Sequence, residues 1–226
     1  QAGLPHIDRR FLRGFVLTAQ KKIMTDDILA EGAEWLAQRE PRFAFALSAT
    51  GPLPLRNRAD GFDALLNAIV SQQLSVASAA AIWKRLQNAN MTKAKAIMSA
   101  DDGTLRAAGL SRQKIRYARA LAASGIDFTR LRQCDDAEVI TVLTEVSGIG
   151  VWTAEIYAMF SLSRPDIFAP GDLALQEAAR SLFNLPERPK ERALRQMAEA
   201  WSPWRSVAAR LLWAYYAVIK NKEGIA

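Results

Sequence analysis

Residues 143–172 read LTEVSGIGVWTAEIYAMFSLSRPDIFAPGD, and this stretch decides how the chain is interpreted. Gly148 and Gly150 let the backbone turn tightly just before a long helix pattern with an apolar stripe. A loop with two prolines then leads to Asp172, at the start of another helix pattern. Free amides at the start of a helix attract an anion, so the first part can hold a phosphate backbone. The last part can place a carboxylate beside it.

The composition of the 226 residues limits the chemistry that is available. Lys and Arg number 30 against 23 Asp and Glu, and a formal charge of +7 favours polyanionic partners such as nucleic acid or acidic membranes. A single cysteine, Cys134, and a single histidine, His6, exclude an internal disulfide framework, a zinc or iron–sulfur site and a Cys/His catalytic pair. Carboxylate chemistry, a lysine amine or no chemistry remains.

Targeting and membrane signals are weak. No apolar run approaches the roughly 20 residues of a membrane span. Residues 1–23 are basic and lack the long apolar core of a secretory signal. Met24 resembles a natural start, so we treat residues 1–23 as a leader, either an upstream extension or a cloning remnant. Cys134 fits a free thiol in a reducing compartment, either a bacterial cytoplasm, near the nucleoid, or a nucleus.

Nearly every periodic segment has helical spacing, which predicts an all-α protein of about ten helices. Strand-like alternation appears only near residues 43–49. The predicted helices cover residues 26–40, 62–69, 76–86, 92–99, 101–108, 112–123, 137–144, 151–162, 173–183, 190–200 and 203–219.

Each part of the opening stretch also has a purely structural interpretation. Ser147-Gly148-Ile149-Gly150 fits a helix–hairpin–helix turn on a DNA phosphate, but equally an ordinary connection between packed helices. Asp172 is a favoured helix N-cap and needs no further role. Asp166 is a rival carboxylate that we interpret as a turn acid paired with Arg164.

The combination of these motifs resembles the signature of the helix–hairpin–helix DNA glycosylase superfamily. The matching residues are Gly148-Ile149-Gly150-x-Trp152-Thr153-Ala154 and Pro165-Asp166-x-Phe168-x-Pro170-x-Asp172, with further likeness from about residue 61 to residue 213. These outlying segments are 62–65, 69–75, 109–114 and 201–206. The resemblance implies a catalytic role for Asp172.

Absent residues point to one branch of that family. Bifunctional members carry a nucleophilic lysine where this chain has Trp152, and iron–sulfur members need four cysteines near the C-terminus. The sequence resembles instead the alkylation-repair branch, the 3-methyladenine DNA glycosylase II group. No cofactor and no iron–sulfur cluster are then expected. An ionised Asp172, favoured by its helix N-terminus, would stabilise positive charge on the sugar or orient the attacking water.

The resemblance also assigns a base pocket, a wedge and a cation site. Trp152, Trp213 and Tyr157 would form the pocket, although plain core packing explains them as well. The break at Gln72-Gln73-Leu74 would supply the wedge that fills the gap left by a flipped base, or it is simply a polar turn. Ser147 stands where the family usually has proline. Backbone carbonyls of Thr144, Val146 and Ile149 would hold a structural Na⁺ or K⁺.

The predicted architecture has two helical lobes with the active-site cleft between them. One lobe combines residues 24–60 with 171–226, and the other spans 61–170 with the helix–hairpin–helix at about 143–162. We expect a monomeric, monofunctional glycosylase that excises 3-methyladenine and 7-methylguanine from double-stranded DNA and leaves an abasic site. The alternatives are a non-catalytic helix–hairpin–helix DNA-binding protein and a glycosylase for uracil, deaminated purines or oxidised bases.

Overall fold

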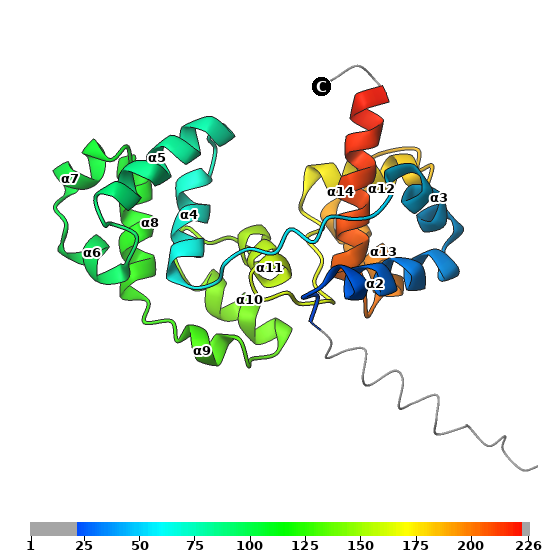
Figure 1. Cartoon of the computed structure of the whole chain (residues 1–226), viewed down its shortest axis with the longest axis horizontal. Coiled ribbons are helices and arrows are strands. Elements are labelled where there is room, and N and C mark those ends of the chain that lie inside the picture. The colour runs from blue at the N-terminus through cyan, green and yellow to red at the C-terminus, as the bar shows by residue number, and fades with distance from the viewer. Residues whose placement is uncertain (1–21, 223–226) are drawn as a thin grey trace, which may run out of the picture. The chain divides into compact units, whose positions relative to one another are not determined.

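The computed structural model describes residues 22–222, and the predicted leader lies outside this range apart from Lys22 and Ile23. Within residues 22–222 there are thirteen α-helices, one 3₁₀ helix and no strand (Figure 1). The predicted all-α class is therefore confirmed. The helices are α2 (Asp26–Arg39), α3 (Pro41–Thr50), α4 (Phe62–Ser71), α5 (Val76–Asn88), α6 (Ala94–Ser99), α7 (Asp102–Ala107), α8 (Arg112–Ala123), α9 (Phe128–Leu131), α10 (Asp136–Thr144), α11 (Val151–Phe160), α12 (Leu173–Leu182), α13 (Glu191–Ala198), η1 (Glu199–Trp201) and α14 (Arg205–Lys222).

Two elements differ from the sequence prediction. The segment suspected of strand-like alternation is the helix α3, with Pro41 in its first turn and Glu40 as its N-cap. Proline is typical of the first helical position, and the Glu40 carboxylate caps the helix by accepting a hydrogen bond from the amide of Arg42 at 3.0 Å. Phe43 explains why the strand prediction failed. Its ring packs edge-on against Phe183 and Trp201, and these tertiary contacts favour a helix over the strand that the local alternation suggested. The single-turn helix α9, capped by Asp127, was not predicted.

Helix caps fix most of the other boundaries. Ser75 accepts a hydrogen bond from the amide of Ser78 at the start of α5, and Ser111 does the same for Lys114 at the start of α8. Asp135 caps α10 through the amide of Glu138. These are the expected N-cap bonds, each worth about 1 kcal/mol.

The described residues divide into two compact units, residues 22–55 with 163–222 and residues 56–162. The boundaries fall five and eight residues before the predicted ones at 60/61 and 170/171. The second shift has a clear cause, because Pro165 and Ile167 form hydrogen bonds with Ser206 at the start of α14. The loop before Asp172 thus belongs to the unit that contains α14.

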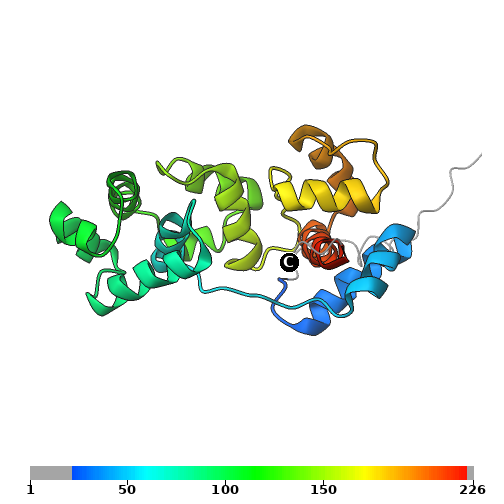
Figure 2. The same cartoon turned by 90° about the horizontal axis from the view of Figure 1, so that it is seen from above.

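In the unit that combines both ends of the chain, α14 packs against α2, α3 and α12 (Figures 1 and 2). Gly32 lets α2 approach closely, since a Cβ at this position would lie 2.7 Å from the ring of Trp204 and 2.8 Å from Val207. Trp201 stacks on Phe183 and meets Phe168 edge-on, which completes an aromatic core. Burial of such rings is the main source of stability in a unit of this size.

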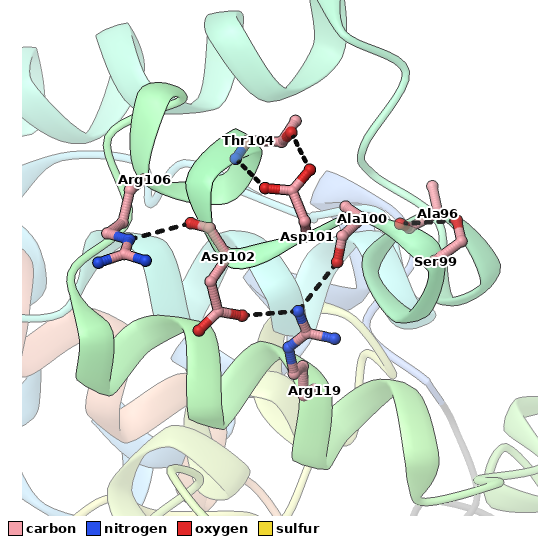
Figure 3. Close-up of polar contacts among 8 residues, drawn as sticks. All are labelled: Ala96, Ser99, Ala100, Asp101, Asp102, Thr104, Arg106 and Arg119. Atoms are coloured by element: carbon pink, nitrogen blue, oxygen red, sulfur yellow. Dashed lines mark hydrogen bonds and ion pairs between the residues drawn. The ribbon is translucent and has the colours of Figure 1, made fainter.

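In the unit of residues 56–162, α8 packs against α4, α6 and α7. Its Arg119 donates 2.9 Å to the carbonyl of Ala100 and 2.7 Å to Asp102, and thereby ties down the link between α6 and α7 (Figure 3). Asp101 caps α7 through the amide and hydroxyl of Thr104, which lowers the pKa of the Asp101 carboxyl. None of the described helices is both long and apolar enough to cross a membrane.

Candidate active site

Asp172 is the N-cap of α12 and has extended backbone angles. Its Oδ1 accepts hydrogen bonds from the amide of Ala174 at 2.9 Å and from that of Leu175 at 3.1 Å. The structural interpretation made from the sequence, a capping aspartate, is therefore confirmed. The side chain is only partly buried, so a cap does not exclude a second role.

A third donor reaches the same oxygen from a distant part of the chain. Trp213, in the middle of α14, donates its indole Nε1–H to Asp172 Oδ1 at 3.2 Å. The two residues are 41 positions apart in sequence. An ordinary N-cap needs only its own helix, so this contact gives the carboxylate a fixed direction that capping alone does not require.

The loop that delivers Asp172 is anchored to the start of α14. The Ser206 hydroxyl donates to the carbonyl of Ile167 at 2.8 Å and accepts from its amide at 3.0 Å, and Ser206 is fully buried. The backbone amide of Ser206 also donates to the carbonyl of Pro165 at 2.9 Å. One serine therefore holds three backbone groups of the loop.

Asp166 forms the outer part of this anchor. Its two carboxylate oxygens accept from Arg205 Nε and Nη2, both at 2.8 Å, in the paired geometry that favours an Arg–carboxylate contact. Ser202 adds a further hydrogen bond at 2.8 Å. The pairing of Asp166 with Arg164 that we predicted from the sequence was wrong, because Asp166 binds Arg205, at the start of α14, and Ser202 just before it. Asp166 is a structural acid of the loop.

A buried amide completes the support. Gln176, in α12 and only 7% exposed, donates its Nε2–H to the carbonyl of Pro170 at 2.8 Å. Asp172 is thus held on both sides, by the loop before it and by the helix after it. Fixed positioning of this kind is what a group acting on a reacting bond requires.

The predicted hairpin has the geometry of a tight turn. Gly148 has a φ of +97°, which side chains rarely tolerate, and a Cβ there would overlap the ring of Tyr117. Ile149 is buried, and its amide donates to the carbonyl of Val146 at 3.0 Å. Gly150 is exposed and is the N-cap of α11, and no side chain in the described residues caps that helix end. The N-cap position of α11 therefore contributes no side chain to the first turn of the helix.

The carbonyls expected to hold a monovalent cation lie in the same turn. The carbonyl of Val146 already accepts one hydrogen bond, from Ile149, and a carbonyl oxygen has a second lone pair for a ligand. Thr144 uses its hydroxyl as a donor to Ile140 and Thr141, which leaves only its backbone oxygen for this purpose. The residues fit an all-oxygen site, and the cation stays a prediction.

The three candidate wedge residues lie in the link between α4 and α5, and they differ in exposure. Gln73 and Leu74 are exposed, and Gln73 has a φ of +56°. Gln72 is half-buried, and its Nε2–H donates 2.8 Å to the carbonyl of Gly148 in the hairpin. The structure therefore brings the wedge loop and the hairpin together.

The remaining pocket candidates belong to the unit of residues 56–162. Trp152 lies in the first turn of α11 and is 47% exposed. Tyr157 lies further along α11, is 5% exposed, and its hydroxyl accepts a hydrogen bond from the amide of Gly61 at 2.8 Å. Burial raises the pKa of Tyr157 to about 12. This contact makes Tyr157 a tether for the start of α4, and its role in a base pocket stays a prediction.

Sequence reasoning missed the residues that support Asp172. Arg205 and Ser206 lie in the segment 201–206, whose family likeness was noted without any role being given to it. Gln176 gave no signal, because a glutamine in a helix is ordinarily a solvated residue. These contacts join residues up to 39 positions apart, and only the fold reveals them.

The chain is similar to proteins that are already known. Residues 66–203 match the family described as the HhH-GPD superfamily base excision DNA repair protein. DNA-3-methyladenine glycosylase 1 of Schizosaccharomyces pombe is 32% identical over 161 residues, which cover 67% of this chain and 71% of the yeast protein.

Two solved structures are similar as well. The S. pombe 3-methyladenine DNA glycosylase, in complex with abasic DNA, has a TM-score of 0.71 and 28% identity, over 81% of this chain and 95% of the other. A DNA-3-methyladenine glycosidase from Bacillus halodurans has a TM-score of 0.75 and 34% identity, over 83% and 89%. The family match covers more than half of the chain, and the resemblance found in residues 143–172 is confirmed: this chain belongs to the HhH-GPD superfamily of base excision DNA repair proteins.

Proposed function

We propose that this protein is a monofunctional DNA glycosylase that hydrolyses the N-glycosidic bond of alkylated purines and leaves an abasic site. The observation that carries the proposal is the carboxylate of Asp172, whose Oδ1 receives three N–H donors while its loop is anchored to α14. The similar proteins with 3-methyladenine glycosylase names support the choice of substrate. Double-stranded DNA is then the partner, and we propose that the protein acts as a monomer.

The chemistry needs little help from an acid. A purine alkylated on a ring nitrogen carries a positive charge, so the base leaves as a neutral molecule with the electron pair of the breaking N-glycosidic bond. Positive charge then develops on the sugar, and the ionised Asp172 stabilises it electrostatically. Water forms the new bond to the sugar C1′, and its proton passes to Asp172 or to solvent.

The residue at position 152 explains why hydrolysis and not strand cleavage is proposed. A lysine there could attack the sugar and form a Schiff base, whereas the indole of Trp152 has no nucleophilic amine. An exposed indole can instead attract a cationic base through its face, by about 1–2 kcal/mol when water is excluded. Trp152 is therefore proposed as a contact for the damaged base.

The hairpin and the wedge loop complete the proposed mechanism. The first turn of α11 supplies amides for a DNA phosphate. Gln73 or Leu74, both exposed, enters the gap that the flipped nucleotide leaves, which offsets part of the few kcal/mol that unstacking costs. A monovalent cation held by the carbonyls of Thr144, Val146 and Ile149 would support the phosphate contact. We also propose that the protein acts in a reducing compartment that contains DNA, either a bacterial cytoplasm or a nucleus.

A base-release assay tests this function. Duplex oligonucleotides with one 3-methyladenine, 7-methylguanine, uracil, hypoxanthine or 8-oxoguanine are incubated with the protein, and free bases are measured. We expect release of the two methylated purines, strand breaks only after alkali, and no borohydride-trapped adduct. Release of none of the five bases, with DNA binding intact, would favour the non-catalytic helix–hairpin–helix protein. Release of only uracil, hypoxanthine or 8-oxoguanine would favour another glycosylase class.

A further inference from the structure

The wedge loop and the hairpin share one peptide group. The carbonyl of Gly148 accepts the Nε2–H of Gln72 at 2.8 Å, and the amide on the other side of that peptide, Ile149 N–H, donates to the carbonyl of Val146 at 3.0 Å. Both faces of the peptide between Gly148 and Ile149 are therefore fixed. Its orientation determines where the following amides, at Gly150 and the start of α11, are directed.

Helix α8 supports the same junction from both segments. Lys114 donates its ammonium to the carbonyl of Val70 at 2.5 Å, in the last turn of α4 just before the wedge loop. Tyr117 packs its ring against Gly148, and its hydroxyl accepts from Gln113 at 2.7 Å. Each support holds one segment alone, whereas the Gln72 bond joins the two segments directly.

Large apolar side chains are exposed around this junction. Eight large apolar side chains of the described residues are prominently exposed, and four of these lie in the two joined segments or in the first turn of the helix that follows each of them. They are Leu74 (39%), Val76 (88%), Val151 (47%) and Trp152 (47%). Apolar side chains held outward on two linked turns indicate a surface that meets a partner.

We propose that Gln72 is a positioning residue that couples the phosphate-binding hairpin to the wedge, and that it is not itself the wedge. This inference rests on the proposed function. The bond fixes the foot of the wedge loop, so Gln73, held at a φ of +56°, projects from a support that also orients the phosphate-binding amides. Gripping the backbone and opening the base stack then depend on one hydrogen bond.

The central test is the variant Gln72→Met, which keeps the length of the side chain but removes the N–H donor. The rate of unstacking is followed in stopped flow by 2-aminopurine fluorescence beside a 7-methylguanine lesion, and base release is measured on the same DNA. Loss of one hydrogen bond is expected to slow both about fivefold to tenfold. Binding to undamaged duplex should weaken by a similar factor, because the same bond orients the amides that bind the phosphate.

A second substrate separates positioning from general damage to the fold. When the lesion faces a gap or a mismatch, unstacking costs less, so the loss caused by Gln72→Met should shrink toward wild type. An equal loss on paired and unpaired lesions would overturn the coupling. The matched control is Gln87→Met on α5, an exposed glutamine of the same unit, which should behave as wild type in every assay.

A further variant covers the case in which Gln72→Met folds poorly. Gln72→Glu is nearly isosteric and polar, but it places an acceptor against the carbonyl of Gly148, so its loss should equal or exceed that of the methionine variant. Wild-type unstacking rates in folded Gln72→Glu would overturn the inference and leave the proposed function standing. A wild-type protein that releases no methylated base would overturn both.

Discussion

Trp213 and Asp172 are joined by a hydrogen bond from the indole Nε1 to Oδ1, the same oxygen that receives two backbone amides of α12. From the sequence, Trp213 was expected to contact the base, and Asp172 to act separately as the catalytic carboxylate. The structure shows that the aromatic residue also orients the carboxylate.

Replacement of Asp172 by asparagine should abolish catalysis and preserve the fold. Asparagine is as good an N-cap as aspartate, so the melting temperature should change little. Without the negative charge, the rate of methylated-base release should fall by about a hundredfold or more, while binding to duplex DNA stays similar. Single-turnover base release and a fluorescence-anisotropy titration measure the two quantities.

Asp166→Asn is the matched control for that experiment. It removes a carboxylate of the same loop, and with it the charged pairing to Arg205. We expect a loss of about 1–3 kcal/mol of stability, measured by urea unfolding, and less than a tenfold change in the rate. If Asp166→Asn removed base release and Asp172→Asn did not, the catalytic assignment would be reversed.

Trp213→Phe should separate the two roles of this residue. The ring is retained, but the N–H that orients Asp172 is lost. Base release should slow about threefold to tenfold at saturating DNA, as expected for one hydrogen bond, with binding unaffected. Trp213→Ala should in addition weaken selection of damaged over undamaged duplex. A wild-type kcat in Trp213→Phe would contradict the inference that Trp213 orients the carboxylate of Asp172.

Much of the fold could be predicted from the chain, because local signals carry it. Helix α8 begins and ends at the predicted residues, Arg112 and Ala123, since Ser111 caps it and its apolar positions are periodic. The start of α12 after Asp172 follows from the same logic. The prediction failed near residues 43–49, where alternating Phe and Ala residues resemble a strand. In the structure these residues belong to α3, because packing of Phe43 on Trp201 favours a helix.

The site was predictable only in part. Asp172 and the glycine turn form local motifs, so their positions could be read directly from the sequence. The partners Arg205, Ser206 and Trp213 are 39 to 41 residues from the groups they hold, and no local pattern encodes such pairs. Gln72 could be placed in the wedge loop, but its contact with Gly148 spans 76 positions.

The two hairpin glycines should respond differently to alanine. Gly148→Ala places a Cβ at positive φ and against Tyr117, so it should cost about 1–3 kcal/mol of unfolding free energy or more. Gly150→Ala meets no atom within 4 Å, so stability should change by less than about 1 kcal/mol. Its affinity for duplex DNA should nevertheless fall, because the methyl group occupies the space of an approaching phosphate. Unchanged affinity in Gly150→Ala would contradict that approach.

The buried phenol of Tyr157 should make the folded protein less stable at alkaline pH. Burial raises the pKa of its phenol to about 12, above the ordinary value near 10. Between these values the unfolded chain loses the proton while the folded chain retains it, so stability falls as pH rises, by up to about 1.4 kcal/mol per unit. Tyr157→Phe should be less stable at pH 7, since the amide of Gly61 loses its acceptor.

Urea unfolding at several pH values checks this prediction. The stability advantage of the wild type over Tyr157→Phe should narrow steadily between pH 10 and pH 12. A constant difference over that range would show that the phenol is not buried in solution. Other titrating groups affect both proteins alike, so the comparison isolates one residue.

The division of the chain has a consequence for how the protein is made. The unit of residues 56–162 is one continuous segment. In the other unit, α2 and α3 cannot complete their packing until α12 and α14 have been synthesised, more than a hundred residues later. Domains generally fold as units during synthesis, so a unit can fold only when all of its segments have been made. The hydrogen bond from Trp213 to Asp172 can therefore form only once residue 213 has left the ribosome, and a nascent chain stalled earlier would contain the hairpin turn but an Asp172 carboxylate without its indole donor.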